Sequence, residues 1–321
     1  MGCKDSKARI ALIGSNGMLA TMLKQVVPAS CEIHPFDLPE FDITDRTQVL
    51  DRLTSLRPEV IINCAAFTQV DRCETEEALA NRVNGEAVGF LAEAAKAADA
   101  TLVHISTDYV FAGDQTRPYR EDDPTAPQSA YGRSKLLGEQ AILSSGLEKY
   151  FIVRTSWLYG PGGNNFVETM IRLAKEREEL RVVADQVGSP TYTADLAEAI
   201  VRLVASDKLR VTSKGSLSVT RHPSLVTDFP SPPFGLYHFA NEGQCSWYEF
   251  AEEIIALARK HGEPIVTQRV VPITTGEYPL PAKRPAYSVM SKEKYKAATG
   301  MQIPDWQKSL RKYLGNRTSG V

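Results

Sequence analysis

A short apolar run passes directly into a glycine-rich turn near the start of the chain, in Arg9-Ile10-Ala11-Leu12-Ile13-Gly14-Ser15-Asn16-Gly17-Met18-Leu19-Ala20. The run Arg9–Ile13 is typical of a buried strand, and an apolar helical pattern continues after the turn to Val26. Gly14 permits the tight turn, and Gly17 lets backbone amides approach a pyrophosphate at the N-terminus of the helix. Ala20 stands where a third glycine is common. The order of strand, turn and helix predicts a Rossmann-type dinucleotide-binding unit.

The second predicted strand, Cys31–Phe36, ends at Asp37. An acid at this position often accepts hydrogen bonds from the adenosine ribose and disfavours a 2′-phosphate. The alternative makes Asp37 a turn or cap residue. Asp42 is expected near the adenine, and Thr44 or Asp45 is expected to cap the next helix. No arginine lies beside Asp37 in the sequence, so NADH is expected to be accepted, with NADPH left open.

Two further apolar runs, Val60–Ala66 and Thr101–Asp108, predict the next strands. Small residues at the end of the first would let a cofactor lie against the backbone. The second ends in Ser106, Thr107 and Asp108, which are expected to face a ligand because the carboxyl ends of strands in doubly wound sheets form the ligand crevice. The alternative, turn residues ending a strand, explains Ser106 better than Thr107.

Tyr131 and Lys135 are spaced i to i+4, so on a helix both side chains lie on one face. A tyrosine hydroxyl ordinarily has a pKa of about 10, and a cation nearby lowers that pKa and makes the hydroxyl a usable acid or base. We therefore expect Lys135 to activate Tyr131. The alternative is a surface tyrosine–lysine pair, because this spacing is common by chance.

The glycine pattern, Ser106–Phe111 and the pair Tyr131 and Lys135 together resemble an extended short-chain dehydrogenase/reductase. Five further segments narrow the resemblance to the dTDP-4-dehydrorhamnose reductase family, from about Arg9 to about Leu314: Asn63–Asp71, Arg154–Tyr159, Gly163–Phe166, Asp185–Thr191 and Arg284-Pro285-x-x-Ser288. The resemblance implies an α/β fold, with a Rossmann-type doubly wound parallel sheet and a smaller α/β substrate lobe built from discontinuous segments.

The resemblance also implies a reaction, the reduction by NADPH or NADH of the C4 ketone of a nucleotide-linked 6-deoxy-4-keto sugar. The catalytic residues would be Thr107, Tyr131 and Lys135: Tyr131 donates a proton, Lys135 lowers its pKa and holds the nicotinamide ribose, and Thr107 hydrogen-bonds the same sugar oxygen. Asn84 would support a water relay or be an ordinary polar helix residue.

Two sets of binding residues follow from the same resemblance. The substrate, most specifically dTDP-4-dehydro-L-rhamnose, would contact Thr107, Asp108, Tyr131, Trp157, Asn165 and Arg284. The cofactor would contact Gly14, Asn16, Gly17, Met18, Leu19, Asp37, Asp42, Ile43, Ala65, Ala66, Thr68, Tyr131 and Lys135.

Tyr109 stands where nucleotide-sugar dehydratases usually carry glutamate, so simple hydride transfer is favoured over elimination. An epimerase or dehydratase with tightly bound NAD is the first alternative, and a catalytically silent regulatory subunit is the second. The intact set of Thr107, Tyr131 and Lys135 counts against the silent subunit.

Composition fits such an enzyme, because 321 residues can form a large domain and a smaller lobe. The net charge of −2 gives no basic field for nucleic acid. Five cysteines without ligand spacing indicate a reducing cytosol and no metal, and the absence of a long apolar run indicates no membrane span. We expect a cytoplasmic protein, and a homodimer as the arrangement to test.

The domain prediction assigns residues 9–160, about 188–205 and 235–242 to the NAD(P)-binding domain. The substrate-binding lobe takes about 161–187 and 243–314. Residues 1–8 are expected to form a disordered leader, although their start also fits an N-myristoylation pattern. A Ser/Thr/Pro-rich flexible insertion is expected at 206–234 and a tail at 315–321.

Overall fold

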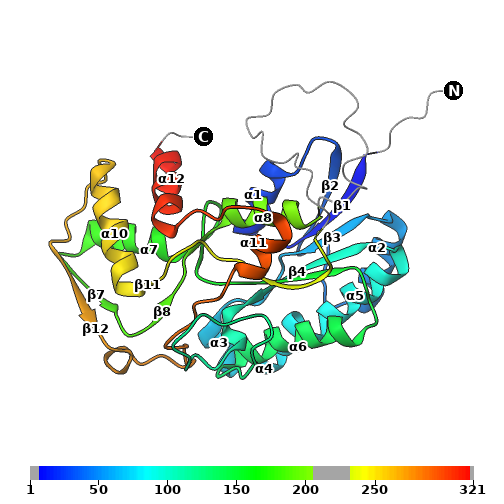
Figure 1. The fold of residues 1–321 in the computed structure, drawn as a ribbon, viewed down its shortest axis with the longest axis horizontal. Coiled ribbons are helices and arrows are strands. Elements are labelled where there is room, and N and C mark those ends of the chain that lie inside the picture. The colour runs from blue at the N-terminus through cyan, green and yellow to red at the C-terminus, as the bar shows by residue number, and fades with distance from the viewer. Residues whose placement is uncertain (1–6, 205–231, 319–321) are drawn as a thin grey trace.

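The computed structural model describes residues 7–204 and 232–318 (Figure 1). The expected leader, apart from its last two residues, and most of the expected insertion lie outside these ranges. Six parallel strands form the central sheet in the order β10-β5-β4-β3-β1-β2. They are β1 (Ala8–Ile13), β2 (Cys31–Phe36), β3 (Val60–Asn63), β4 (Thr101–Thr107), β5 (Tyr150–Thr155) and β10 (Gly235–His238).

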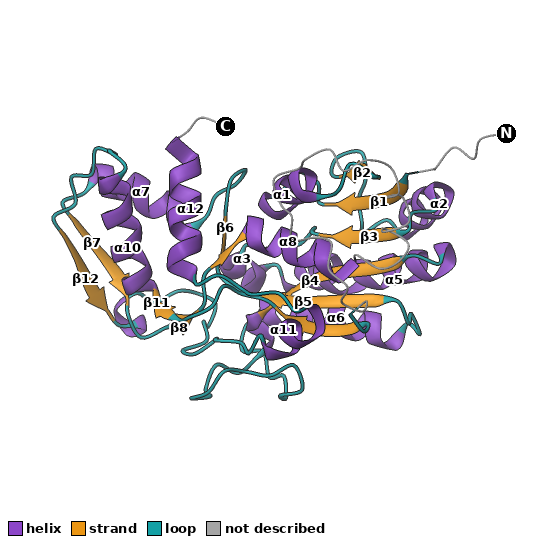
Figure 2. Ribbon diagram, turned by 45° about the horizontal axis from the view of Figure 1, so that its top comes forward, coloured by secondary structure: helices purple, strands orange, loops and turns teal. Residues whose placement is uncertain are grey.

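Helices cover both faces of this sheet, as Figure 2 shows. On one face, α1 (Met18–Val26) and α8 (Thr193–Val204) pack against alternate residues of β1, Ile10 and Leu12. On the other, α2 (Arg46–Leu56), α5 (Ala87–Ala98) and α6 (Ala130–Ser144) pack against Ala11 and Ile13. Burial on both faces explains why the strands are nearly continuous apolar runs. The strand order reverses at β1, where doubly wound sheets bind dinucleotides.

The smaller lobe, at the left in Figure 1, contains three helices: α7 (Phe166–Glu176), α10 (Trp247–Lys260) and α12 (Trp306–Thr318). Its strands β7 (Glu179–Val183) and β12 (Arg269–Ile273) pair in parallel. Two short ladders join it to the sheet domain, β8 (Val187–Gly188) with β11 (Cys245–Ser246) and β6 (Leu158–Tyr159) with β9 (Thr191–Tyr192). The remaining helices within the described ranges are α3 (Val70–Thr75), α4 (Glu77–Asn81) and α11 (Glu293–Thr299), with a π-helical turn (Arg82–Glu86) and two 3-10 turns (Asp108–Val110 and Thr275–Glu277).

The predicted fold class is confirmed, whereas several predicted element ends differ. The sequence predicts a C-terminal helix over Ile303–Leu314, whereas the helix begins at Trp306, because Asp305 caps it by accepting a hydrogen bond from Lys308 N at 2.7 Å. Asp45 caps α2 as expected, through a bond from Gln48 N at 3.0 Å. The strand predicted over residues 60–66 stops at Asn63, where the chain turns away from the sheet.

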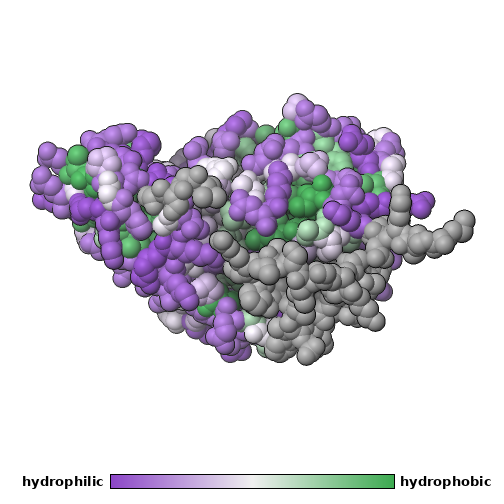
Figure 3. Space-filling view, turned by 90° about the horizontal axis from the view of Figure 1, so that it is seen from above, coloured by the Kyte–Doolittle hydropathy of each residue, from purple (hydrophilic) through white to green (hydrophobic). Residues whose placement is uncertain are grey.

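The face of the molecule drawn in Figure 3 is mostly polar, with apolar side chains gathered on the larger lobe. Within the described ranges, no helix is long and apolar enough to cross a membrane. The residue limits proposed for the two domains stay a prediction.

Candidate active site

The glycine-rich turn lies at the carboxyl end of β1, where the strand order reverses. Gly14 has a φ of +71°, and a Cβ there would lie 2.6 Å from the backbone nitrogen of Ala65. Glycine is therefore required both for the left-handed backbone and for the close approach of the turn to the chain after β3. Gly17 N donates to Gly14 O at 3.1 Å, and α1 begins at the next residue, Met18. Its first turn contains no acid, so the N-terminal amides present an anion-binding site.

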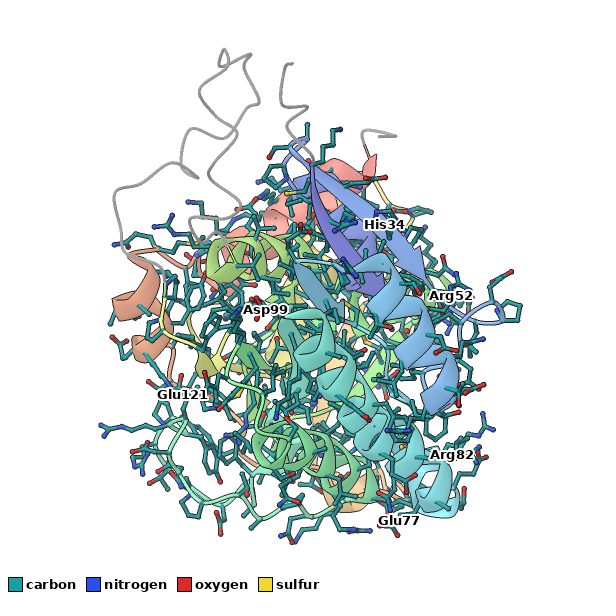
Figure 4. The ribbon with its side chains drawn as sticks, turned by 90° about the vertical axis from the view of Figure 1, so that its right-hand side faces the viewer. His34, Arg52, Glu77, Arg82, Asp99 and Glu121 are labelled. Carbon is teal, nitrogen blue, oxygen red and sulfur yellow. The ribbon has the colours of Figure 1, made fainter. Side chains whose placement is uncertain are left out.

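Asp37, at the end of β2, is held by the same turn. Its Oδ2 accepts from Asn16 N at 2.7 Å, and its Oδ1 accepts from Leu38 N at 2.9 Å. A cavity of about 330 Å³ beside it is also lined by Lys24 and Arg52. The Arg52 guanidinium lies 5.7 Å from the centroid of the Phe36 ring. No arginine is next to Asp37 in the sequence, but α2 brings Arg52, labelled in Figure 4, to the same cavity.

Asp42 and Ile43, two of the expected cofactor contacts, have structural partners in the turn before α2. Asp42 Oδ1 accepts from both the backbone nitrogen and the hydroxyl of Thr44, each at 2.8 Å. Ile43 is buried in the core beneath the sheet. Thr68 is exposed in the loop between β3 and α3.

Thr107, Asp108 and Tyr131 meet where β4 ends and α6 begins. Thr107 Oγ1 donates to Asp108 Oδ1 at 3.0 Å and accepts from Tyr109 N at 3.2 Å. Tyr131, in the first turn of α6, packs edge-on against Tyr109 with ring centroids 5.5 Å apart. Ser129 caps α6, and its hydroxyl accepts from Gly132 N at 3.2 Å. The fold therefore brings together three residues expected to contact the reacting sugar.

Asp108 is 2% exposed, and its Oδ2 has no hydrogen-bond partner among the described residues. Burial raises the pKa of this carboxyl to about 6, although nearby hydroxyls of Ser288 and Thr107 offset part of the effect. Asp108 thus combines a costly buried charge with an unused acceptor atom, which is typical of a functional site.

Lys135 contacts β4 instead of the Tyr131 hydroxyl. Its Nζ donates to Ile105 O at 2.6 Å and lies 3.4 Å from His104 Nε2. Burial lowers the pKa of Lys135 to about 8 and raises the pKa of Tyr131 above its ordinary value, although a hydrogen bond with Thr107 partly offsets the latter. The pKa of Tyr131 is therefore raised and not lowered in this arrangement, and the expected effect of Lys135 on it stays a prediction. Desolvation is the main cause of this rise, the charge of Asp108 adds to it, and the Tyr131 hydroxyl therefore keeps its proton at neutral pH.

Trp157 holds an unusual backbone conformation beside the smaller lobe. Its φ is +48°, and its ring stacks on Trp247 with centroids 3.5 Å apart and planes inclined by 9°. A Cβ at Gly188 would lie 2.6 Å from Trp157 Cε2, so only glycine fits beneath the indole. A left-handed conformation in a bulky residue is costly and is often found at functional sites. Trp247, the first residue of α10, was missed because no local pattern links it to Trp157.

Two expected substrate contacts, Asn165 and Arg284, are engaged within the protein. Asn165 caps α7 by accepting from Glu168 N at 3.1 Å, and its Nδ2 donates to the carbonyls of Gly160 and Gly163 at 3.0 and 3.2 Å. The Arg284 guanidinium donates two bonds of 2.6 Å to Asp71, and these lower the pKa of that carboxyl. Both side chains hold loops at the edge of the site.

Asn84, in the π-helical turn between α4 and α5, is 1% exposed. Its Oδ1 accepts from Phe67 N at 2.8 Å, and its Nδ2 donates to Phe67 O and Ser134 Oγ, each at 3.0 Å. Because every group of the amide is used, this arrangement gives no support to a water relay. Asn84 instead fixes the loop after β3 against α6.

The described part of the chain contains no group of three or more His, Cys, Asp or Glu side chains that could hold a metal ion.

Comparisons with known proteins agree with this geometry. The family model described as "RmlD substrate binding domain" matches residues 8–319. A dTDP-4-dehydrorhamnose reductase of Burkholderia thailandensis is 40% identical over 302 residues, which cover 93% of this chain and 95% of that protein. The crystal structure of a dTDP-4-dehydrorhamnose reductase from Clostridium acetobutylicum has a TM-score of 0.83 at 40% identity and covers 96% of this chain and 99% of its own.

The crystal structure of the Bacillus anthracis dTDP-4-dehydrorhamnose reductase, in complex with NADP, also has a TM-score of 0.83. It is 41% identical and covers 97% of this chain and 99% of its own. Since the family model and these relatives each match nearly the whole sequence, the chain belongs to the RmlD substrate binding domain family, that of the dTDP-4-dehydrorhamnose reductases.

Proposed function

We propose that this protein reduces the C4 ketone of a nucleotide-linked 6-deoxy-4-keto sugar, with dTDP-4-dehydro-L-rhamnose as substrate and dTDP-L-rhamnose as product. The observation that carries the proposal is the meeting of Thr107, Asp108 and Tyr131 at the carboxyl end of β4, with Lys135 one helical turn further along α6. The names of relatives 40% identical to this chain supply the substrate.

The cofactor is NADPH or NADH, which supplies hydride when bound. The turn at Gly14 and Gly17 fits its pyrophosphate, because a Cβ at Gly14 would close the space between the turn and Ala65. We assign further contacts to Asn16, Met18, Leu19, Asp42, Ile43, Ala66 and Thr68. Asp37 would accept from the adenosine ribose, and Arg52 would pair with the 2′-phosphate of NADPH, since no described carboxylate forms an ion pair with Arg52 and it lines the same cavity.

Tyr131 is the proton donor in this proposal. A ketone oxygen that receives hydride becomes an alkoxide, which is a much stronger base than a phenolate, so a neutral tyrosine can protonate it. The raised pKa of Tyr131 keeps its proton in place until that charge develops. Thr107 Oγ1 would turn its one proton from Asp108 Oδ1 to the same sugar oxygen, and this second hydrogen bond would stabilise the charge as it forms.

Substrate contacts are assigned to Asp108 and Trp157 first, because Asp108 has an unused carboxylate oxygen and Trp157 has a left-handed backbone conformation of the kind found at functional sites. Asn165 and Arg284 would act by holding the adjoining loops, and Arg284 would reach the substrate only by leaving Asp71. Tyr109, in place of a dehydratase glutamate, favours reduction without elimination.

The test is oxidation of NADPH and of NADH with dTDP-4-dehydro-L-rhamnose, followed by the loss of dihydronicotinamide absorbance and by chromatography of the sugar. One cofactor oxidised for each sugar reduced is expected. Sugar conversion without net oxidation of either cofactor would show an epimerase or dehydratase instead.

A further inference from the structure

His104 is completely buried in the middle of β4, between a side chain of the neighbouring strand and the lysine of α6. Asn63, its register partner on β3, places Nδ2 3.1 Å from His104 Nδ1. Lys135 places Nζ 3.4 Å from His104 Nε2. Asn63 and Lys135 are themselves 1% and 2% exposed, so this three-residue chain is shielded from water.

The bond that Asn63 makes with Ala65 fixes the direction of the hydrogen bonds among Asn63, His104 and Lys135. Asn63 Oδ1 accepts from Ala65 N at 3.1 Å, so the amide must turn its nitrogen toward His104. Asn63 Nδ2 is a donor, and His104 Nδ1 must therefore present its lone pair. A neutral imidazole with its lone pair at Nδ1 carries its proton at Nε2. The ring stays neutral because burial, together with the charge of Lys135, holds the pKa of His104 well below its ordinary value.

The Nε2–H bond of His104 consequently points at Lys135 Nζ. An ammonium group has only donors, so a second donor facing it is unfavourable, whereas a neutral amine can accept this bond with its lone pair. A neutral amine is also satisfied on its other side, where it donates to Ile105 O at 2.6 Å.

Few other groups bear on the charge of Lys135. Glu139, on its own helix, favours the ammonium, but its carboxylate already accepts from Arg154 at 2.9 and 2.7 Å and from Ser106 at 2.5 Å. The thiol of Cys64, just beyond the end of β3, is half-buried, and desolvation raises its pKa to about 12, so it is neutral. Within the described ranges, no carboxylate forms an ion pair with Lys135.

We propose that His104 is a positioning residue whose Nε2–H, oriented by Asn63, disfavours the charged form of Lys135 and so lowers the pH above which Lys135 loses its proton. This inference rests on the proposed reduction, in which the ammonium would stabilise the phenolate left on Tyr131 after proton transfer. His104 and Asn63 would then determine the position of the alkaline limb of the pH profile of kcat/KM.

The tautomer can be tested without any activity. Protein labelled with ¹⁵N-histidine is examined by long-range ¹H–¹⁵N correlation NMR, with His104→Phe used to assign the signals. We expect the pattern of a neutral ring protonated at Nε2. A proton at Nδ1, or a ring that titrates between pH 6 and 9, would overturn the proposal even if the protein proved not to be a reductase.

The functional consequence is tested with Asn63→Asp, which replaces the donor by an acceptor and should move the proton of His104 to Nδ1. The lone pair of Nε2 then faces the ammonium, and the alkaline limb should move upward by about one pH unit. The same substitution in a His104→Phe background separates this effect from the added charge. A much smaller shift there supports the proposal, and an equal shift refutes it because the carboxylate would then act directly on Lys135.

Discussion

Replacing Asp108 by asparagine should stabilise the protein at neutral pH, because the wild-type carboxylate is buried with one oxygen unpaired. Its pKa rises from the ordinary value of 3.8 to about 6 in the folded chain. A shift of roughly two pKa units corresponds to about 3 kcal/mol of free energy. Well below pH 3.8 the carboxyl is protonated in both folded and unfolded chains, so no charge is buried. The stability that the protonated form provides is lost as the pH rises through the folded pKa.

The free energy of unfolding of Asp108→Asn should therefore exceed that of the wild type by an amount that grows with pH. The ionisation contributes roughly 1.5 kcal/mol at pH 5 and about 3 kcal/mol at pH 8. Urea denaturation at pH 5, 6, 7 and 8 measures the difference. The asparagine oxygen can still accept the hydrogen bond from Thr107. The part of the difference in unfolding free energy that changes with pH therefore measures the effect of the buried charge.

A second buried acid provides the control. Asp195, on α8, accepts from Asn241 at 2.8 Å and from Ser309 at 2.5 Å, so Asp195→Asn breaks satisfied hydrogen bonds and should destabilise the protein. A difference between Asp108→Asn and the wild type that does not change from pH 5 to pH 8 would refute the reasoning. Because Asp108 is assigned to the substrate, its variant should also lose turnover while it gains stability.

Three further predictions concern the cofactor, the proton donor and the packing of α6. Tyr131→Phe should keep its fold and its cofactor binding, measured by fluorescence titration, but lose about 10²–10⁴ in turnover; near-normal turnover would remove it from the proposed role. Arg52→Ala should raise the KM for NADPH about tenfold and change the KM for NADH little. The control is Arg46→Ala, on the same helix but paired with a glutamate, which should change neither KM. Equal losses with both cofactors in Arg52→Ala would exclude a 2′-phosphate contact. Gly138→Ala should lower the free energy of unfolding by about 1–3 kcal/mol, measured by thermal or urea denaturation, because its Cβ would lie 2.3 Å from a carbonyl oxygen of the π-helical turn. The control Gly89→Ala, whose Cβ would lie 3.6 Å from its nearest neighbour, should leave the stability unchanged or raise it slightly.

The sequence alone predicted the doubly wound sheet, because each parallel strand is a short apolar run bounded by turn residues and buried on both faces. It also predicted which residues would meet at the carboxyl ends of the strands. Thr107 ends one strand and Asp108 follows it, so the rule for ligand crevices places both at that edge, whereas the meeting with Tyr131, in the first turn of the helix after it, was implied by the family resemblance. Asp45 as a helix cap follows in the same way from local hydrogen bonding.

Charge states and long-range partners depended on the tertiary structure. The spacing of Tyr131 and Lys135 says that they share a helix face, but only the packed β4 shows that Lys135 bonds to Ile105 O and that burial raises the pKa of Tyr131. Likewise, Arg52 reaches the cavity beside Asp37 because α2 folds back over β2. Local sequence encodes backbone conformation, whereas desolvation and contact between distant residues arise only when the elements pack together.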